Sequence, residues 1–441
     1  MTQNKFMQFM EEKFMPVAGK IGSLRHLVAI RDGFVGIMPL IIIGSLAVLI
    51  NNFPWDGFQD FMVMVFGENW KSVGDSIWNG SFAILSLLVT ASIAYKLAES
   101  YEVDGISAAL IAVGALVVLT PVTEDFGLSF TWLGAQGLFV AVLTSILATE
   151  VFRILTKYER LRIKMPEGVP DGVTKSFNAL LPAAIILFSA GLFNTLITAG
   201  FDQSIHELVF SVIQEPLQGL SNTMGSALIF AFLNQLLWFF GLHGTNILGP
   251  VMESIYLPLI EENQSLFAAG TSAFDVPYIV TKPFFDAYVF MGGSGATLAL
   301  ILAIFLVVKS KHYRTVGKLS SAPGIFNINE PMLFGLPVVL NPMMFIPFLL
   351  IPVILTIVAY SAIALGFVPK TVAILPWTTP PILSGYLVTG GSWSGVILQL
   401  INLSIATAMY IPFIMAADRS QMKNMGSEDV ADHEEKKVSG Q

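Results

Sequence analysis

Two ionisable residues stand almost alone in long apolar stretches of this sequence, and each lies where the apolar pattern is interrupted. Glu330 is one of only two charged residues in the stretch 319–417, and His243 is the only ionisable side chain in the stretch 216–252. A charged group at the centre of a bilayer costs about 2.5–3.5 kcal/mol on insertion scales, so it is rarely kept without a function. Interrupted apolar segments that carry such groups are typical of transport sites. We therefore predict that Glu330 and His243 belong to a transport site.

The surroundings of Glu330 favour chemistry on a hydroxyl group. Pro331 removes a backbone donor and disfavours helical geometry at Glu330, which predicts a turn or a helix break. The amides of Asn327 and Asn329 can donate and accept the hydrogen bonds of a sugar hydroxyl. A carboxylate in an apolar pocket can also accept a proton near neutral pH. The alternative is a cytosolic turn in which Glu330 pairs with Lys318 at the surface.

His243 lies in the segment Gly241-Leu-His-Gly-Thr-Asn246, whose flanking glycines allow a tight turn and the close approach of a ligand. A lone histidine on an apolar helix is usually a core residue, but here polar neighbours favour a site. We predict that the following residues line the site with it: Asn234, Trp238, Gly244, Thr245, Asn246 and Asn329. Asn234 and Trp238 are four residues apart and therefore share one face of a helix. Five histidines and no cysteine show no ligand spacing, so we predict no metal site.

Two other motifs are weaker candidates. The run 292–295, Gly-Gly-Ser-Gly, could turn backbone amides toward a ligand, although small residues also serve helix packing in membranes, and packing is the favoured interpretation. Trp377 lies in a proline-broken segment and could stack on a pyranose ring, or it could be an aromatic residue of the membrane interface. We include Gly293, Ser294 and Trp377 among the substrate-binding candidates. For Arg31, at the edge of the first apolar run, we favour anchoring at the interface.

The composition identifies the class of protein that must position these residues. Of the 441 residues, 54% are hydrophobic and 12% are charged, against about 25% charged in a soluble domain. A mean hydropathy of +0.71 predicts a polytopic membrane protein. The absence of cysteine excludes disulfides and a cysteine-based covalent intermediate within this chain. The net charge of −8 comes partly from six acids in the last 24 residues, so we expect no nucleic-acid partner and no cofactor.

We predict an all-α polytopic membrane protein with about ten transmembrane helices, re-entrant hairpins and amphipathic interfacial helices. Residues 371–390 are apolar but broken by prolines, so they could span, re-enter or lie in a cleft. No signal peptide is visible, and residues 6–17 have the spacing of an amphipathic helix at the membrane surface or docked on the protein. The apolar runs long enough to span are 33–50, 77–98, 104–121, 132–156, 177–200, 223–242, 287–308, 337–367 and 393–415.

The distribution of basic residues orients the chain. Lysine and arginine before the first run and in the loop 153–164 place the N-terminus in the cytoplasm. In the second half, successive apolar runs that cross the membrane in alternating directions do not bring the basic stretch 309–318 to the cytoplasm. They would do so only if residues 243–285 crossed the membrane once more. We interpret this as evidence for re-entrant or discontinuous helices there.

A division into four parts follows from these patterns. We expect an N-terminal transmembrane half for dimerisation, an interfacial connector, a C-terminal half that binds and carries the substrate, and an acidic cytoplasmic tail. Their ranges are 1–202, 203–222, 223–415 and 416–441.

Together the motifs Gly241-Leu-His-Gly-Thr-Asn246 and Gly324-Ile-Phe-Asn-Ile-Asn-Glu-Pro331 resemble the membrane IIC component of the bacterial phosphotransferase system. The resemblance is to its lactose, cellobiose and diacetylchitobiose group and runs over almost all of residues 5–415. It implies a homodimer in the bacterial inner membrane that binds a β-linked disaccharide. It also implies phosphorylation of the C6 hydroxyl by a phosphocysteine on a IIB protein.

On this resemblance Glu330 would hold and deprotonate the 6-hydroxyl, while His243 would hydrogen-bond the same sugar. Asn329 and Asn246 would add hydrogen bonds, and Trp377 would stack. Because the chain has no cysteine, IIB would be a separate protein that docks on the cytoplasmic face. The basic loops 153–164 and 309–318 are candidates for that contact, although orientation signals alone explain them as well.

Two other classes of function compete with this interpretation. A proton-coupled sugar or peptide symporter would use Glu330 and His243 as a proton relay and would need no partner protein. A membrane scaffold or sensor would bind sugar without moving it, which two interrupted helices and small extramembrane parts disfavour.

Overall fold

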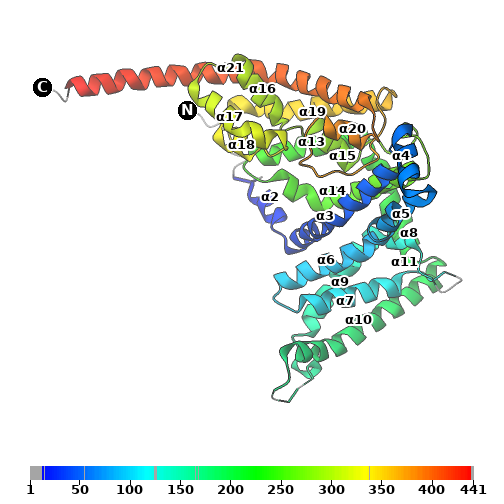
Figure 1. Ribbon diagram of the computed structural model, residues 1–441. Coiled ribbons are helices and arrows are strands. Elements are labelled where there is room, and N and C mark those ends of the chain that lie inside the picture. Colours follow the sequence, from blue (N-terminus) through cyan, green and yellow to red (C-terminus); the bar gives the residue numbers. More distant parts are fainter. Residues whose placement is uncertain are drawn as a thin grey trace.

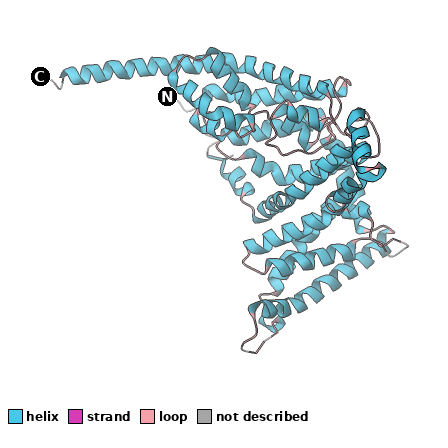
Figure 2. Ribbon diagram, in the orientation of Figure 1, coloured by secondary structure: helices cyan, strands magenta, loops and turns pink. Residues whose placement is uncertain are grey.

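The computed structural model describes residues 12–13, 15–53, 55–123, 127–163, 165–166, 168–336 and 338–438. These residues form helices joined by loops, and within them no extended strand occurs beyond an isolated bridge between Val122 and Leu128 (Figures 1 and 2). The predicted all-α membrane fold is confirmed.

The first half of the chain forms layers of helices, and the long helices between residues 85 and 201 lie in the lower part of Figure 1. Its packing rests on small residues: Ala94, Ala108 and Ala148 lie in one buried core, where short side chains let the helix backbones approach closely. Its helices are α2 (Met15–Gly22), α3 (Arg25–Asn51), α4 (Asp56–Phe66), α5 (Ser72–Asn79), α6 (Leu85–Ser100), α7 (Gly105–Leu119), α8 (Phe130–Leu133), α9 (Leu138–Leu155) and α10 (Asp171–Phe201).

Two short helices, α11 (Ile205–Val209) and α12 (Glu215–Ser221), lead to the second half. That half lies in the upper part of Figure 1. Its helices are α13 (Met224–Phe239), α14 (Gly244–Ala268), α15 (Lys282–Phe284), α16 (Thr297–Val307), α17 (Lys311–Ile325), α18 (Glu330–Gly335), α19 (Pro342–Ala364), α20 (Leu383–Val388) and α21 (Trp393–Val438).

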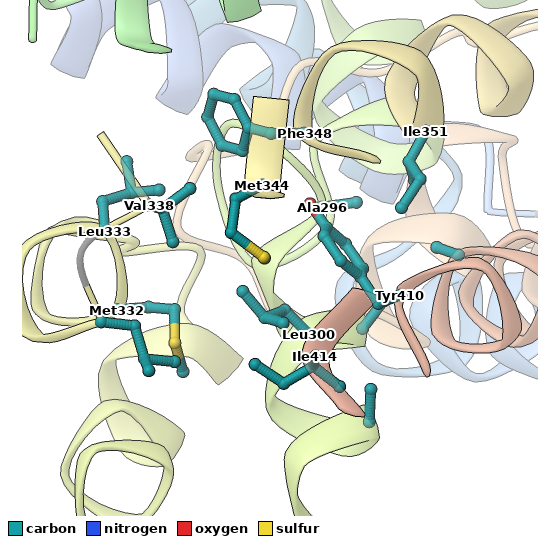
Figure 3. Close-up of a cluster of buried hydrophobic side chains, with 14 of the residues drawn as sticks. Ala296, Leu300, Met332, Leu333, Val338, Met344, Phe348, Ile351, Tyr410 and Ile414 are labelled. Atoms are coloured by element: carbon teal, nitrogen blue, oxygen red, sulfur yellow. The ribbon is translucent and has the colours of Figure 1, made fainter. Parts of the chain in front are cut away.

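The core of the second half lies beneath the predicted site motifs. Phe348 and Met344 of α19 meet Leu300 of α16, Leu333 of α18 and Tyr410 of α21 in one buried cluster (Figure 3). Residues that are distant in sequence therefore support the same region from several sides.

Helix α3 joins the two halves. Phe34 and Ile37 pack in a core that holds Leu85 of α6 and also Leu257 of α14 and Ile374 of the second half. One continuous apolar core thus runs from the predicted dimerisation half into the predicted transport half. The proposed boundary at residue 202 stays a prediction.

In the described part of the chain, six helices are long and apolar enough to cross a membrane, and α3, α10, α19 and α21 contribute four of them. Helix α14 is not among these six, and it lies in the segment for which we predict re-entrant or discontinuous helices. Its 25 residues form a continuous helix beside α3, and at about 1.5 Å per residue it is about as long as the membrane is thick. Its glutamates and prolines hide it from a search for apolar runs.

Residues 366–382 contain no regular helix. The segment 371–390 therefore does not cross the membrane as a single continuous helix. Buried there, Val372 donates its N–H to Val388 O over 2.7 Å, and Ile374 donates to the Ser45 hydroxyl over 2.6 Å. Non-helical backbone at membrane depth is tolerated when protein groups take up its hydrogen bonds in this way.

The two chain ends differ from the sequence-based expectation in detail. Residues 1–11 and 14 lie outside the described residues, and they include most of the predicted amphipathic segment 6–17. The predicted tail does not start as a separate element, because α21 continues to Val438 and extends away from the other helices (Figure 1). Near its start, Asp418 accepts the backbone N–H groups of Lys309 and Ser310 over 3.0 and 3.2 Å.

Candidate functional site

The structure brings together the two ionisable residues that the sequence singled out. His243 is the residue that caps the start of α14, and Glu330 is the first residue of α18. The His243 Nε2 atom lies 3.8 Å from Glu330 Oε1, although 87 positions separate the two in the sequence. Both side chains are a little less than half exposed, so a ligand can reach them.

A hydrogen bond determines which nitrogen of His243 carries the proton. The backbone N–H of Asn246 donates to His243 Nδ1 over 3.2 Å, so the neutral ring carries its hydrogen on Nε2. The Trp238 ring packs on the imidazole with 4.2 Å between centroids and holds its orientation. His243 therefore presents an N–H donor on the side of Glu330.

The gap between the two groups is chemically informative. At 3.8 Å, Nε2 and Oε1 are farther apart than the 2.7–3.2 Å of an ordinary hydrogen bond. A hydroxyl oxygen that lies beside the pair, within hydrogen-bond distance of both atoms, can accept from the His243 N–H and donate to the Glu330 carboxylate. The arrangement can thus bind a hydroxyl and remove its proton, which is the role expected of a general base.

Behind the pair lies a buried polar network formed by α13, the start of α14 and the glycine-rich loop. Asn234 donates to the Ser294 hydroxyl over 3.0 Å and accepts from the Thr245 hydroxyl over 3.3 Å. Trp238 Nε1 donates to the same Thr245 oxygen over 3.3 Å. Asn234 and Ser294 are buried, so they position the site from behind, whereas Thr245 and Asn246 are exposed beside His243.

Gly244 is required because α13 and α14 meet at close range. A Cβ atom at this position would lie 2.4 Å from the Asn234 carbonyl oxygen and 3.0 Å from Trp238 Cδ1. No side chain fits there without moving the start of α14, which carries His243.

The loop 292–295 is joined to the Asn-Ile-Asn-Glu segment by hydrogen bonds. Asn327 Oδ1 accepts the Gly292 N–H over 2.7 Å, and Asn329 Nδ2 donates to Ser294 O over 3.1 Å. Gly293 has a φ of 92° and a Cβ there would lie 2.7 Å from Asn327 O, so both the conformation and the space require glycine. The two asparagines are buried and use these amide atoms to shape the turn that presents Glu330.

The backbone of the broken segment at Trp377 also reaches this turn. Asn327 Nδ2 donates to the carbonyl oxygens of Trp377 and Thr379 over 2.7 and 3.0 Å. The Trp377 side chain is 51% exposed, and it lines a small cavity together with Asp286. Its predicted stacking on a sugar ring remains a prediction.

A charged cluster at membrane depth was missed by the sequence reasoning. Lys282 Nζ lies 2.9 Å from Asp286 Oδ2 and 3.8 Å from Glu253 Oε1, and these groups border cavities that reach both α3 and the Trp377 segment. Charged residues in apolar segments of the predicted transport half were the available signal. Arg31, for which we favour anchoring at the interface, has its Cγ facing Gly249 of α14, and its anchoring role stays a prediction.

In the residues that the structure describes, no cluster of histidine and carboxylate side chains could hold a metal ion. The side chains of the site can form hydrogen bonds, accept a proton and position a hydroxyl group.

Comparison with known proteins gives consistent matches along the chain. The family model "Phosphotransferase system, EIIC" matches residues 31–352. The lichenan permease IIC component of Bacillus subtilis is 40% identical over 434 residues, covering 95% of both chains. The cellobiose-specific EIIC component of Geobacillus stearothermophilus is 41% identical, also with 95% of both chains covered.

A solved structure agrees with these relatives. The crystal structure of the transporter ChbC, the IIC component of the N,N'-diacetylchitobiose-specific phosphotransferase system, superposes with a TM-score of 0.90. It is 40% identical and covers 95% of this chain and 99% of the ChbC chain.

Proposed function

Because this chain belongs to the EIIC family of the bacterial phosphotransferase system, we propose that it imports a β-linked disaccharide of the cellobiose or diacetylchitobiose type. Members of this family are multi-pass proteins of the bacterial cell membrane that work with a IIB partner and a sugar. The names of the relatives support the sugar class. The relatives reported above are named as IIC components, so the proton-coupled symporter is not favoured.

The observation that carries the proposed mechanism is the 3.8 Å gap between His243 Nε2 and Glu330 Oε1. The 6-hydroxyl of the sugar would lie beside this pair, within hydrogen-bond distance of both atoms. Glu330 would take its proton, and the His243 N–H would hold the same oxygen in place. Phosphoryl transfer depends mainly on such positioning and on charge stabilisation.

The transfer step uses a donor from outside this chain. The sugar O6 atom forms a bond to phosphorus while the phosphorus–sulfur bond of the IIB phosphocysteine breaks, and the hydroxyl proton passes to Glu330. The chain contains no cysteine, so the phosphocysteine belongs to the separate IIB protein.

The remaining assignments support this role. Asn234, Trp238, Gly244 and Thr245 would hold the start of α14, while Gly293, Ser294 and Asn329 would hold the start of α18. Asn246 and Trp377 would contact the sugar. We further propose a homodimer, in contact with membrane lipid, that is formed through the N-terminal half.

The test is uptake of radiolabelled cellobiose and diacetylchitobiose by cells that express the chain, with and without the soluble phosphotransferase proteins. We expect internal label as sugar phosphate, and only when the partners are present. Free sugar that accumulates without them and is lost with a protonophore would overturn the proposal in favour of a symporter.

A further inference from the structure

We propose that the outer face of the protein carries a second carbohydrate site, an entry vestibule in which the disaccharide binds before it reaches His243 and Glu330. The vestibule is an open cavity of about 480 Å³. Residues of the N-terminal half and the loop after α14 line it together, including Asn52, Phe53, Gln59, Lys71, Phe267 and Thr271. The ligand class rests on the proposed function, but the site shares no residue with the inner pair.

The register of α3 against α14 shows that the vestibule and the inner pair lie at opposite ends of α14. Arg31 faces Gly249, and 14 residues further along α3, Ser45 meets Gln264, so the two helices run in parallel. His243 precedes one end of α14, and Phe267 lies at the other.

The distance agrees with a complete crossing. The 24 residues from His243 to Phe267 correspond to about 36 Å of helix, against a hydrocarbon core of about 30 Å. The basic loops place the N-terminus in the cytoplasm, so the vestibule faces the outside, where the sugar arrives.

The lining has the chemistry that binds a neutral sugar. Phe53 and Phe267 contribute aromatic side chains to the lining, and aromatic rings can pack on the apolar face of a pyranose. Asn52 Nδ2 donates to Val48 O over 3.0 Å, and Gln59 Nε2 donates to Phe53 O over 3.0 Å. These bonds orient both amides, and among the described residues their carbonyl oxygens have no protein donor. Sugar hydroxyls can donate to those oxygens.

A buried polar contact lies along α3 and α14 between the vestibule and the inner pair. The Ser45 hydroxyl accepts hydrogen bonds from Gln264 Nε2 and from the Ile374 N–H, so it joins α3, α14 and the broken segment. Ser45 and Gln264 are fully buried. On α14 this contact lies between His243 and Phe267, so the vestibule and the inner pair are distinct sites.

The experiment compares the two faces of the membrane. Phe53→Ala and Lys71→Gln would each be assayed in intact cells, where the sugar comes from outside. They would also be assayed in inside-out vesicles with phosphorylated IIB, where the sugar reaches His243 and Glu330 from the cytoplasmic side. For Phe53→Ala we expect the KM for uptake to rise about tenfold, as the loss of one aromatic contact predicts. For Lys71→Gln we expect a smaller rise, and for both variants an unchanged KM in the vesicles.

The matched control is Trp55→Ala, which removes an aromatic ring that is 64% exposed and lies outside the vestibule lining. It should leave both KM values unchanged. An unchanged uptake KM in Phe53→Ala, or an equal rise on both faces, would overturn the vestibule. If the wild-type protein forms no sugar phosphate on either face, the proposed function fails instead, so the two failures are distinguishable.

Discussion

Gly244→Ala tests whether the close approach of α13 and α14 positions the catalytic pair. The added Cβ would lie 2.4 Å from the Asn234 carbonyl oxygen, about 1 Å short of the 3.4 Å at which ordinary contact begins. The start of α14 must therefore move by about 1 Å, and His243 moves with it. A misplacement of that size can cost about 100-fold in rate, or about 2.7 kcal/mol of transition-state stabilisation.

The assay is formation of sugar phosphate by membranes that contain the variant, supplied with saturating phosphorylated IIB and labelled disaccharide. We expect the rate to fall about 100-fold. Thermal unfolding of the purified protein in detergent should show a folded variant, destabilised by about 1–3 kcal/mol through overpacking.

Gly249→Ala is the matched control on the same helix. Its added Cβ would meet only Arg31 Cγ, at an ordinary 3.9 Å, and alanine favours a helix interior over glycine by about 1 kcal/mol. Its rate should match that of the wild type. A Gly244→Ala protein within threefold of the wild-type rate, or an equal loss in Gly249→Ala, would refute the reasoning.

Three other substitutions test separate parts of the structure. Glu330→Gln should lower sugar-phosphate formation by about 10²- to 10⁴-fold while sugar binding persists, and normal turnover would remove Glu330 from the mechanism. Asn327→Ala should lower the thermal midpoint, because three backbone groups lose their hydrogen bonds at about 1–3 kcal/mol each; an unchanged midpoint would contradict that role. Lys282→Ala should destabilise the protein by about 3–5 kcal/mol, because Glu253 and Asp286 lose their cation. Adding Asp286→Asn should restore part of that stability, and no recovery would argue against an ionic cause.

Composition and local pattern alone could predict that this is a membrane protein and that His243 and Glu330 are its candidate site residues. Burying a charge without a use is costly, so an isolated Glu330 and an isolated His243 in apolar sequence already indicate a site. The search for apolar runs did not find α14 as one helix, because Glu253 and two prolines inside the helix lowered its apolar character. It also left Lys282 unnoticed.

The roles of the motif asparagines illustrate a second limit. The sequence predicts that the amides beside Glu330 meet sugar hydroxyls, and this stays a prediction. In the structure Asn327 and Asn329 are buried and bond to the loop 292–295 and to the Trp377 segment. An amide can bond equally well to a ligand or to backbone, and only its neighbours decide between them.

By itself, then, the sequence determined that the protein lies in a membrane and which two residues we predict to carry the chemistry. Only the tertiary structure decided that His243 presents Nε2–H, that Glu330 Oε1 lies 3.8 Å from it, and that a second cavity is lined by Phe267, at the end of α14 opposite His243. The physical reason is that the cost of burying a charge and the preference of glycine and proline for turns depend on residues close together in the chain. Distances between residues 87 positions apart depend instead on how the helices and glycine turns pack around them.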